Sequence, residues 1–260
     1  SAMEQVSGLL QIFWMYAKLL ILPFPLTPFY DWQSLSLSRD LLGFDAITGA
    51  LLLSGFVALA LQWKKFPTGA FLAASLLICL APYSHIVPFT VGAAERFLYT
   101  PSIFALILTG FAVQIFAERQ LMSPFIERFG IALFTAWMIL AISWSAVRHT
   151  HWYSNRSILT ATTRLFPESF NGWKALGDTC RAEGALEEAV GYYAIALDTA
   201  PYPIAAYLEA STLLDLGRVA EARMRLDDFM QKNPGLKAVD PKGMEMLGNL
   251  VDDLNQRLRR

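Results

Sequence analysis

Four long stretches of this 260-residue chain contain no aspartate, glutamate, lysine or arginine. They lie at positions 46–63, 66–94, 97–117 and 129–147. Because a helix that crosses a bilayer needs roughly 20 apolar residues, these stretches predict membrane spans. Buried core helices of a large soluble protein are the alternative interpretation, but so many uncharged stretches so close together disfavour it.

The predicted fold class is therefore all-α, with a polytopic membrane domain of about five spans. The spans are expected near residues 8–26, 44–62, 67–87, 97–117 and 129–147. The first of them is interrupted by one lysine and two prolines. It does not resemble a cleaved signal peptide, which has a shorter apolar core and is not followed by four further spans.

The charged residues divide the chain into two parts. Residues 1–147 contain 14 of them, whereas residues 148–260 contain 29. We therefore expect a membrane domain over 1–147 and a water-exposed domain over 148–260. The formal net charge of −1 gives no electrostatic basis for nucleic-acid binding. The only two cysteines are far apart in the sequence, and no motif for a metal or a cofactor is evident.

The basic residues of the loops predict how the membrane domain is oriented. Those on one side are Lys64, Lys65, Arg119 and Arg128. Since cytoplasmic loops are enriched in lysine and arginine, this side should face the cytoplasm. Residues 148–260 then lie on the extracytoplasmic side of a bacterial inner membrane or an endoplasmic reticulum membrane.

Residues 148–260 carry an internal repeat. Pro167, Pro201 and Pro234 recur at a nearly constant interval, and Gly184 and Gly217 are separated by almost the same interval. This period predicts a tetratricopeptide repeat (TPR), a helix–turn–helix unit of about 34 residues. An unrelated pair of helical hairpins with coincidental prolines is the alternative.

The first repeat contains the small and large residues that a tetratricopeptide repeat needs. Gly177 and Ala189 should let its two helices approach closely, and Gly184 should permit the turn between them. We expect Trp173 to pack against Ala189 and Tyr193.

The rest of the predicted solenoid is less regular. In the second repeat, the positions expected to hold Trp, Leu and Gly are occupied by Ala206, Glu209 and Ala210. Residues 154–166 should form a lone helix before the first repeat. A final apolar stripe at helical spacing predicts a capping helix; its members are Met244, Leu247, Val251, Leu254 and Leu258.

The first helix of each unit should line a concave groove that binds an extended protein or peptide segment. The candidate groove residues are Asn171, Lys174, Asp178, Arg181, Tyr207, Ser211 and Asp215. Their mixed charges fit a protein partner better than a nucleic acid. The alternative is that they are simply solvated helix faces.

Three basic residues of the membrane domain are candidates for binding a lipid phosphate. Lys18 lies within an apolar stretch, so it should contact a lipid phosphate or a buried carboxylate, or else extend to the membrane surface. His85 lies in a polar, proline-rich segment, and Arg96 opens the next span. Arginine can hold a phosphate through two parallel hydrogen bonds. Alternatively, Glu95 and Arg96 form an internal clamp that orders the loop.

The run Glu95-Arg96-Phe97-Leu98-Tyr99-Thr100-Pro101-Ser102 resembles the E-R-x-L-Y-x-P-S segment of the transmembrane-and-TPR-containing (TMTC-type) O-mannosyltransferases and their bacterial relatives. The stretch from Tyr16 to Pro23, followed by Leu26 and Asp31-Trp32, resembles another segment of that family. The order of spans, motif, final span and repeats is also similar.

The resemblance implies a membrane glycosyltransferase of the C type (GT-C), which transfers a sugar from a polyprenyl-phosphate carrier to an acceptor. It also implies that the catalytic acid belongs to an early loop of a longer membrane domain. No acid of this chain maps onto that position, so the catalytic residue is unknown. We expect the C-terminal part of such an enzyme, or a degenerate relative without independent activity. A membrane-anchored repeat scaffold without activity is the alternative.

Overall fold

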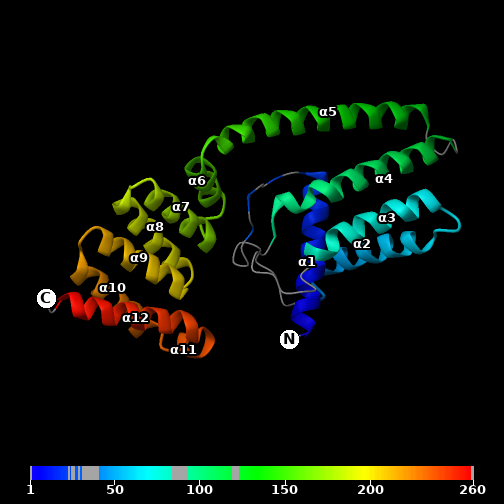
Figure 1. Ribbon diagram of the computed structural model, residues 1–260. Coiled ribbons are helices and arrows are strands. Elements are labelled where there is room, and N and C mark those ends of the chain that lie inside the picture. The colour runs from blue at the N-terminus through cyan, green and yellow to red at the C-terminus, as the bar shows by residue number, and fades with distance from the viewer. Residues whose placement is uncertain are drawn as a thin grey trace. The chain divides into compact units, whose positions relative to one another are not determined.

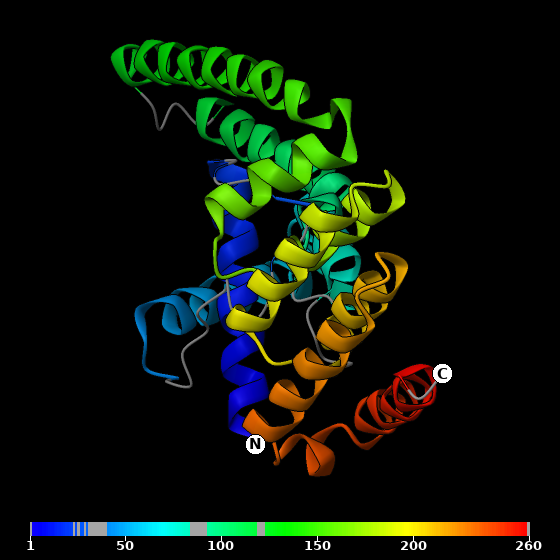
Figure 2. The same ribbon diagram turned by 90° about the vertical axis from the view of Figure 1, so that its left-hand side faces the viewer.

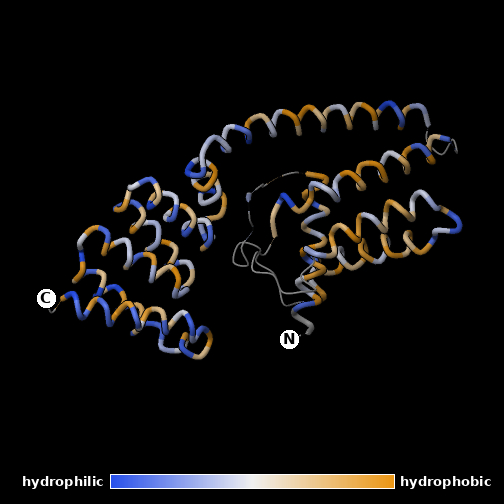
Figure 3. Tube along the Cα trace, in the orientation of Figure 1, coloured by the Kyte–Doolittle hydropathy of each residue, from blue (hydrophilic) through white to orange (hydrophobic). Residues whose placement is uncertain are grey.

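The computed structural model describes residues 2–22, 24, 27–28, 30, 41–83, 93–118 and 123–258. Across these residues the chain is helical and has no strand; an isolated bridge joins Tyr30 to Ala93. The chain divides into two compact units, Ser1–Val147 and Arg148–Arg260. Figure 3 shows that hydrophobic residues dominate α2 to α5, whereas α6 to α12 alternate between hydrophobic and hydrophilic residues.

The first unit is a set of apolar helices. Its elements are α1 (Ala2–Ile21), α2 (Phe44–Leu61), α3 (Pro67–Leu80), the 3-10 turn η1 (Ala81–Tyr83), the 3-10 turn η2 (Glu95–Leu98), α4 (Tyr99–Glu118) and α5 (Pro124–His149). Helix α2 packs against α1 and α3, and α3 also packs against α4 (Figure 1). Successive helices from α1 to α4 are therefore neighbours in space as well as in sequence.

Three helical segments are long and apolar enough to cross a membrane: Phe44–Leu61, Glu95–Glu118 and Pro124–Tyr153. The most apolar 18-residue windows of these segments have mean hydropathies of 1.9, 1.7 and 1.8. In the most apolar window of the third segment, no residue is buried within the described protein. An apolar helix with no buried face fits a lipid environment better than water.

The two remaining predicted spans differ from the helices that are observed: α1 begins and ends earlier than expected, and α3 is shorter. Helix α1 ends at Ile21 rather than at residue 26, because Leu22 precedes a proline and is thereby disfavoured in the helical conformation. Helix α3 ends at Leu80 rather than at residue 87, and a 3-10 turn containing Pro82 follows it. A proline ring clashes with the carbonyl four residues earlier, which ends an α-helix. That α1 and α3 also cross the membrane stays a prediction.

The second unit is a succession of short helices. They are η3 (Thr150–Tyr153), α6 (Asn155–Leu165), α7 (Phe170–Ala182), α8 (Leu186–Thr199), α9 (Pro203–Asp215), α10 (Val219–Lys232), α11 (Leu236–Val239) and α12 (Pro241–Leu258). From α6 to α10 each helix packs against the next, and α12 packs against α9, α10 and α11. Figure 2 shows these helices side by side along the unit.

The turns after α7 and α9 have the same hydrogen bonds. Gly184 has φ +80°, and Gly217, at the equivalent place after α9, has φ +76°. After α7, the N–H of Ala185 donates to the carbonyl of Cys180 at 2.9 Å. After α9, the N–H of Arg218 donates to the carbonyl of Leu213 at 2.8 Å. Both are Schellman helix ends, which need a residue in the left-handed conformation.

Hydrophobic side chains from α8, α9, α10 and α12 make the largest core of the second unit. Leu213, Leu226, Leu247 and Leu254 are fully buried in it. Two of these four belong to the stripe that predicted the final helix. Leu258, the last member of that stripe, is 49 % exposed. Helix α12 thus covers the apolar side of the α9–α10 pair.

The packing predicted for Trp173 is wrong. Its ring stacks on Tyr192, with centroids 5.9 Å apart, and contacts the cluster that contains Ala196. Tyr193 instead packs against Gly177, one helical turn after Trp173. The glycine thus meets residue 193, and the tryptophan, one turn earlier on α7, meets Tyr192 and the cluster that contains Ala196, on either side of residue 193 in the sequence.

Candidate functional site

The start of α4 is held by contacts with the chain that follows α1. The backbone N–H of Tyr30 donates to the carbonyl of Ala93 at 2.7 Å, and Ala93 N–H donates back at 3.1 Å. Three residues later, Arg96 Nη1 donates to the carbonyl of Pro28 at 3.2 Å. The Glu95–Ser102 motif thus begins where the two segments meet.

Arg96 also belongs to a short aromatic stack. Its guanidinium carbon lies 5.1 Å from the centre of the Phe97 ring, and that ring stacks on Tyr83 with a centroid distance of 4.0 Å. Tyr16 on α1 is 2 % exposed and lies within electrostatic range of Tyr83 and Arg96. The side chain of Arg96 is itself exposed. An exposed guanidinium beside an aromatic ring can bind an anion through its remaining N–H groups.

Lys18 has a carboxylate partner. Its ammonium lies 3.5 Å from Asp45 Oδ1, at the start of α2, and 5.5 Å from the centre of the Trp14 ring. The side chains of Lys18 and Asp45 are each about half exposed, at 51 % and 52 %. The carboxylate partner expected for this lysine was a buried one, whereas Asp45 is about half exposed.

The three candidate phosphate-binding residues are only partly placed. His85 lies outside the described residues. Within the described residues, Lys18 and Arg96 do not contact each other. The lysine pairs with Asp45, and the arginine donates to the carbonyl of Pro28. Glu95 lies half-buried in the first turn of η2, and its role in ordering the loop stays a prediction.

In the second unit the candidate groove residues bind one another. Lys174 donates to Asp178 Oδ2 at 2.7 Å, and the hydroxyl of Tyr193 donates to Asp178 Oδ1 at 2.7 Å. Burial, together with this hydrogen bond to a carboxylate, raises the pKa of Tyr193. Both oxygens of Asp178 are therefore already used within the protein.

Arg181 joins α7 to α9. It donates to Asp215 Oδ2 through Nη2 at 2.6 Å and through Nε at 3.2 Å, and to the hydroxyl of Ser211 at 3.0 Å. Asn171, at the start of α7, is exposed. Most candidate groove residues between these two helices thus have internal partners and cross-link neighbouring helices.

Another candidate binding surface of the second unit lies between α9 and α12. A shallow hollow of about 450 Å³ is lined by Tyr207, Lys242, Glu245, Met246, Asn249, Leu250 and Asp253. Tyr207 alone was expected in a binding groove. The α12 residues were missed, although Lys242, Met246, Asn249 and Asp253 follow one another at helical spacing beside the apolar stripe. That spacing is the signal that could have identified them.

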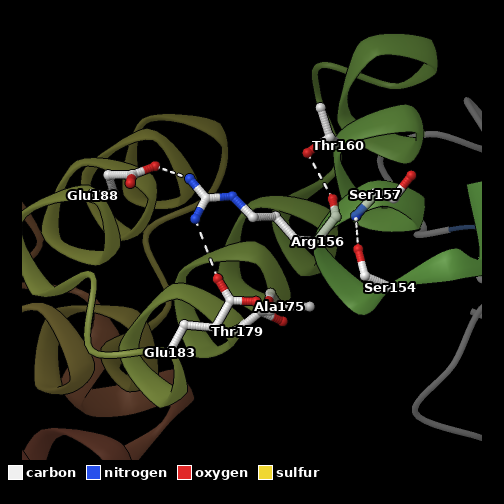
Figure 4. A network of polar contacts seen from close by, with 8 residues as sticks. All are labelled: Ser154, Arg156, Ser157, Thr160, Ala175, Thr179, Glu183 and Glu188. Carbon is white, nitrogen blue, oxygen red and sulfur yellow. Dashed lines mark hydrogen bonds and ion pairs between the residues drawn. The ribbon is translucent and has the colours of Figure 1, made fainter.

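Arg156 ties α6 to the α7–α8 pair, as Figure 4 shows. Its guanidinium donates to Glu183 at 3.2 Å and to Glu188. The hydroxyl of Ser154 accepts the N–H of Ser157 at 3.1 Å and so caps α6. These contacts fix the first helix of the unit, and they engage both terminal nitrogens of this arginine within the protein.

Glu209 is a buried acid in the core of the second unit. It stands where the predicted repeat would have a leucine and is 3 % exposed. Within the described chain its Oε1 atom has no hydrogen-bond partner, and it pairs only loosely with Arg225, at 3.8 Å. Burial raises the pKa of this carboxyl, which Arg225 partly offsets. The residue does not line the hollow between α9 and α12.

Comparison of the chain with models of known protein families, with curated proteins and with solved structures finds no match.

Proposed function

We propose that this chain is part of a membrane glycosyltransferase of the GT-C type, in which Arg96 contacts the phosphate of a polyprenyl-phosphate-linked sugar. The observation that supports this proposal most directly is the position of Arg96. It is exposed at the start of a helix long enough to span a membrane, and it lies beside the ring of Phe97. A phosphate at the end of a membrane span is what the headgroup of a polyprenyl-phosphate carrier presents.

The guanidinium of Arg96 retains N–H groups for such a ligand. Within the described chain its hydrogen bond is the one from Nη1 to Pro28. This bond fixes the side chain and leaves Nη2 and Nε for a phosphate. Arginine binds phosphate well because two of its N–H groups match two phosphate oxygens.

For the second unit we propose a tetratricopeptide-type solenoid that binds the protein acceptor or a partner on the extracytoplasmic side. Its support is the pair of equivalent turns at Gly184 and Gly217 and the sequential packing of α6 to α10. The interval between these two glycines matches the period that is typical of that repeat.

A second candidate function is a membrane-anchored repeat scaffold without activity. The observation that favours it is the hollow between α9 and α12, whose lining includes Tyr207, Met246 and Leu250. Such a surface can hold a protein segment whether or not the first unit binds a lipid-linked sugar.

Lipid binding by the reconstituted chain tests the first proposal. We expect a polyprenyl phosphate to bind in nanodiscs, and the corresponding polyprenol, which lacks the phosphate, to bind much more weakly. Arg96→Gln should weaken binding of the phosphate about tenfold or more, as for a lost charge-assisted pair. Arg128→Gln, which removes an exposed arginine of α5, is the matched control and should have no effect.

The outcome separates the two candidates. Equal affinity for the phosphate and the alcohol, or an unchanged affinity in Arg96→Gln, would remove the glycosyltransferase proposal and leave the scaffold. Circular dichroism of the variant checks that losing the contact with Pro28 has not unfolded the helices. Arg96→Lys, which keeps the charge without the forked geometry, should bind with intermediate affinity.

The side on which the second unit lies can be tested separately. Gln231, on α10, and Gln62, after α2, are both exposed and can each be replaced by cysteine. An impermeant thiol reagent should label Gln231→Cys in intact cells or sealed vesicles of native orientation. Gln62→Cys should react only after the membrane is permeabilised; the opposite pattern would reverse the orientation.

A further inference from the structure

The turn between α2 and α3, residues Gln62–Phe66, is a compact structure that we call the 62–66 turn. The carbonyl of Gln62 accepts the N–H of Lys65 at 2.9 Å and that of Phe66 at 2.8 Å. The N–H of Gln62 in turn donates to Leu59 at 3.0 Å. These bonds fix the backbone, so the turn holds its side chains in a defined arrangement at the end of an apolar helical hairpin.

Each lysine of the 62–66 turn lies beside an aromatic ring. The ammonium of Lys64 is 5.7 Å from the centre of the Trp63 ring, and that of Lys65 is 5.4 Å from the centre of the Phe66 ring. The tryptophan is 64 % exposed. The turn therefore presents two cations and two rings together at its surface.

Within the described residues, the cations of the 62–66 turn are not neutralised by a carboxylate. The sequence contains no acid between Asp45 and Glu95. Asp45 lies at the opposite end of α2, about 27 Å away at 1.5 Å per residue, and is already bound by Lys18.

The position of the turn indicates what it meets. Helix α2 is long and apolar enough to cross a membrane, and α3 is apolar as well. With α2 in a bilayer, the residues directly after Leu61 lie at the level of the lipid headgroups. Tryptophan is enriched at that level, and lysine there is attracted to anionic lipids.

We propose that the 62–66 turn is a binding site for the headgroups of anionic phospholipids. Lys64 and Lys65 contact the phosphate, and the rings of Trp63 and Phe66 lie at the boundary of the hydrocarbon. This site is separate from Arg96 and does not depend on any sugar-transfer activity. Lipid binding at this turn also keeps the turn end of the α2–α3 hairpin at the leaflet that is richer in anionic lipid.

Binding of single lipids to the full chain, measured by native mass spectrometry from mixed micelles, tests the proposal. The probes are phosphatidylglycerol and the zwitterionic phosphatidylcholine, and the former should bind more tightly. A basic residue near an anionic surface contributes about 1 kcal/mol, which corresponds to about fivefold in affinity. The double variant Lys64→Gln/Lys65→Gln should therefore bind phosphatidylglycerol more than tenfold more weakly.

Two further double variants serve as controls. Lys64→Arg/Lys65→Arg keeps both charges and should keep the affinity. Lys232→Gln/Lys237→Gln removes two exposed lysines of the second unit and should leave the affinity unchanged. Thermal melts followed by circular dichroism establish that all variants are folded.

Three results would overturn the proposal. One is equal affinity for the two lipids. Another is undiminished phosphatidylglycerol binding by Lys64→Gln/Lys65→Gln. The third is full displacement of the lipid by millimolar inorganic phosphate, which would indicate a site for free anions. Loss of polyprenyl-phosphate binding in Arg96→Gln with normal phosphatidylglycerol binding would leave the proposal intact, since the two sites are distinct.

Discussion

Gly177 on α7 lies directly against the ring of Tyr193 on α8. A Cβ atom at residue 177 would be 2.7 Å from Cε1 and 2.8 Å from Cδ1 of the tyrosine. Tyr193 is fully buried, and its hydroxyl is held by Asp178, so the ring has little freedom to move away. The absence of a side chain at residue 177 is what allows the two helices to pack at this distance.

Gly177→Ala should therefore destabilise the second unit despite the better helix propensity of alanine. The overpacked contact should cost about 1–3 kcal/mol. Hydrogen exchange of the full chain, read by mass spectrometry on peptides from α7 and α8, reports the local opening free energy. Gly191→Ala on α8 is the control: no described atom lies within 4 Å of its Cβ position, so exchange there should slow or stay the same.

The glycines of the two equivalent turns should respond alike to substitution. A Cβ at Gly184 or Gly217 meets no atom of the described chain, so the cost of alanine arises from the positive φ alone, about 1–2 kcal/mol each. Gly235→Ala, at φ −72° and equally open, should be neutral. Chemical denaturation followed by circular dichroism measures all three. Clearly different costs at residues 184 and 217 would show that the turns are not equivalent.

Glu209 should make the stability of the second unit fall as the pH rises. Burial raises its pKa in the folded state above the ordinary value of 4.5. The folded state therefore binds the proton more tightly than the unfolded state does. The stabilisation that this gives is complete below about pH 4.5 and is lost as the pH rises through the folded-state pKa.

Glu209→Gln should remove this dependence on pH and stabilise the unit at neutral pH by about 1–3 kcal/mol, because an uncompensated buried charge is lost. The lost pair with Arg225, which is 48 % exposed and 3.8 Å away, offsets little of the gain. Thermal unfolding at a series of pH values measures the effect. Glu245→Gln, on the exposed face of α12, should leave the pH profile as it is.

Tyr193→Phe should cost about 1 kcal/mol, since it removes a hydrogen bond from a buried hydroxyl without changing the packing of the ring. The bond to Asp178 is 2.7 Å long. Tyr192→Phe, which keeps the stacking on Trp173, is the matched control and should be neutral. If both variants unfold at the same denaturant concentration as the unchanged chain, the bond to Asp178 adds nothing to stability.

Much of the helical architecture could be predicted because it depends on local patterns. Uncharged stretches identify apolar helices, and the regular spacing of Gly184 and Gly217 identifies two equal turns. Helix ends were less accurate where a proline follows. Helix α1 stops at Ile21 because the next residue precedes Pro23, an effect that the apolar composition of residues 8–26 does not reveal.

Side-chain partners across helices were harder to predict. The sequence shows that Trp173 and Gly177 are one helical turn apart, but not which of them faces Tyr193. That choice depends on the offset between α7 and α8, which the turn at Gly184 sets. Likewise, Arg181 and Asp215 were both expected in a groove, yet they bind each other because α9 brings residue 215 next to residue 181.

The stacking of the second unit has a consequence for its evolution and engineering. Each helix from α6 to α10 packs mainly on its neighbours in sequence. Arg181 on α7 also links the α7–α8 pair to the α9–α10 pair through Asp215. In the repeat array that we propose, the free energy of folding grows repeat by repeat, so the length of the array is not set by a single closed core. Duplicating the segment from one repeating proline to the next, residues 201–233, should insert a whole extra step and leave every existing turn in place.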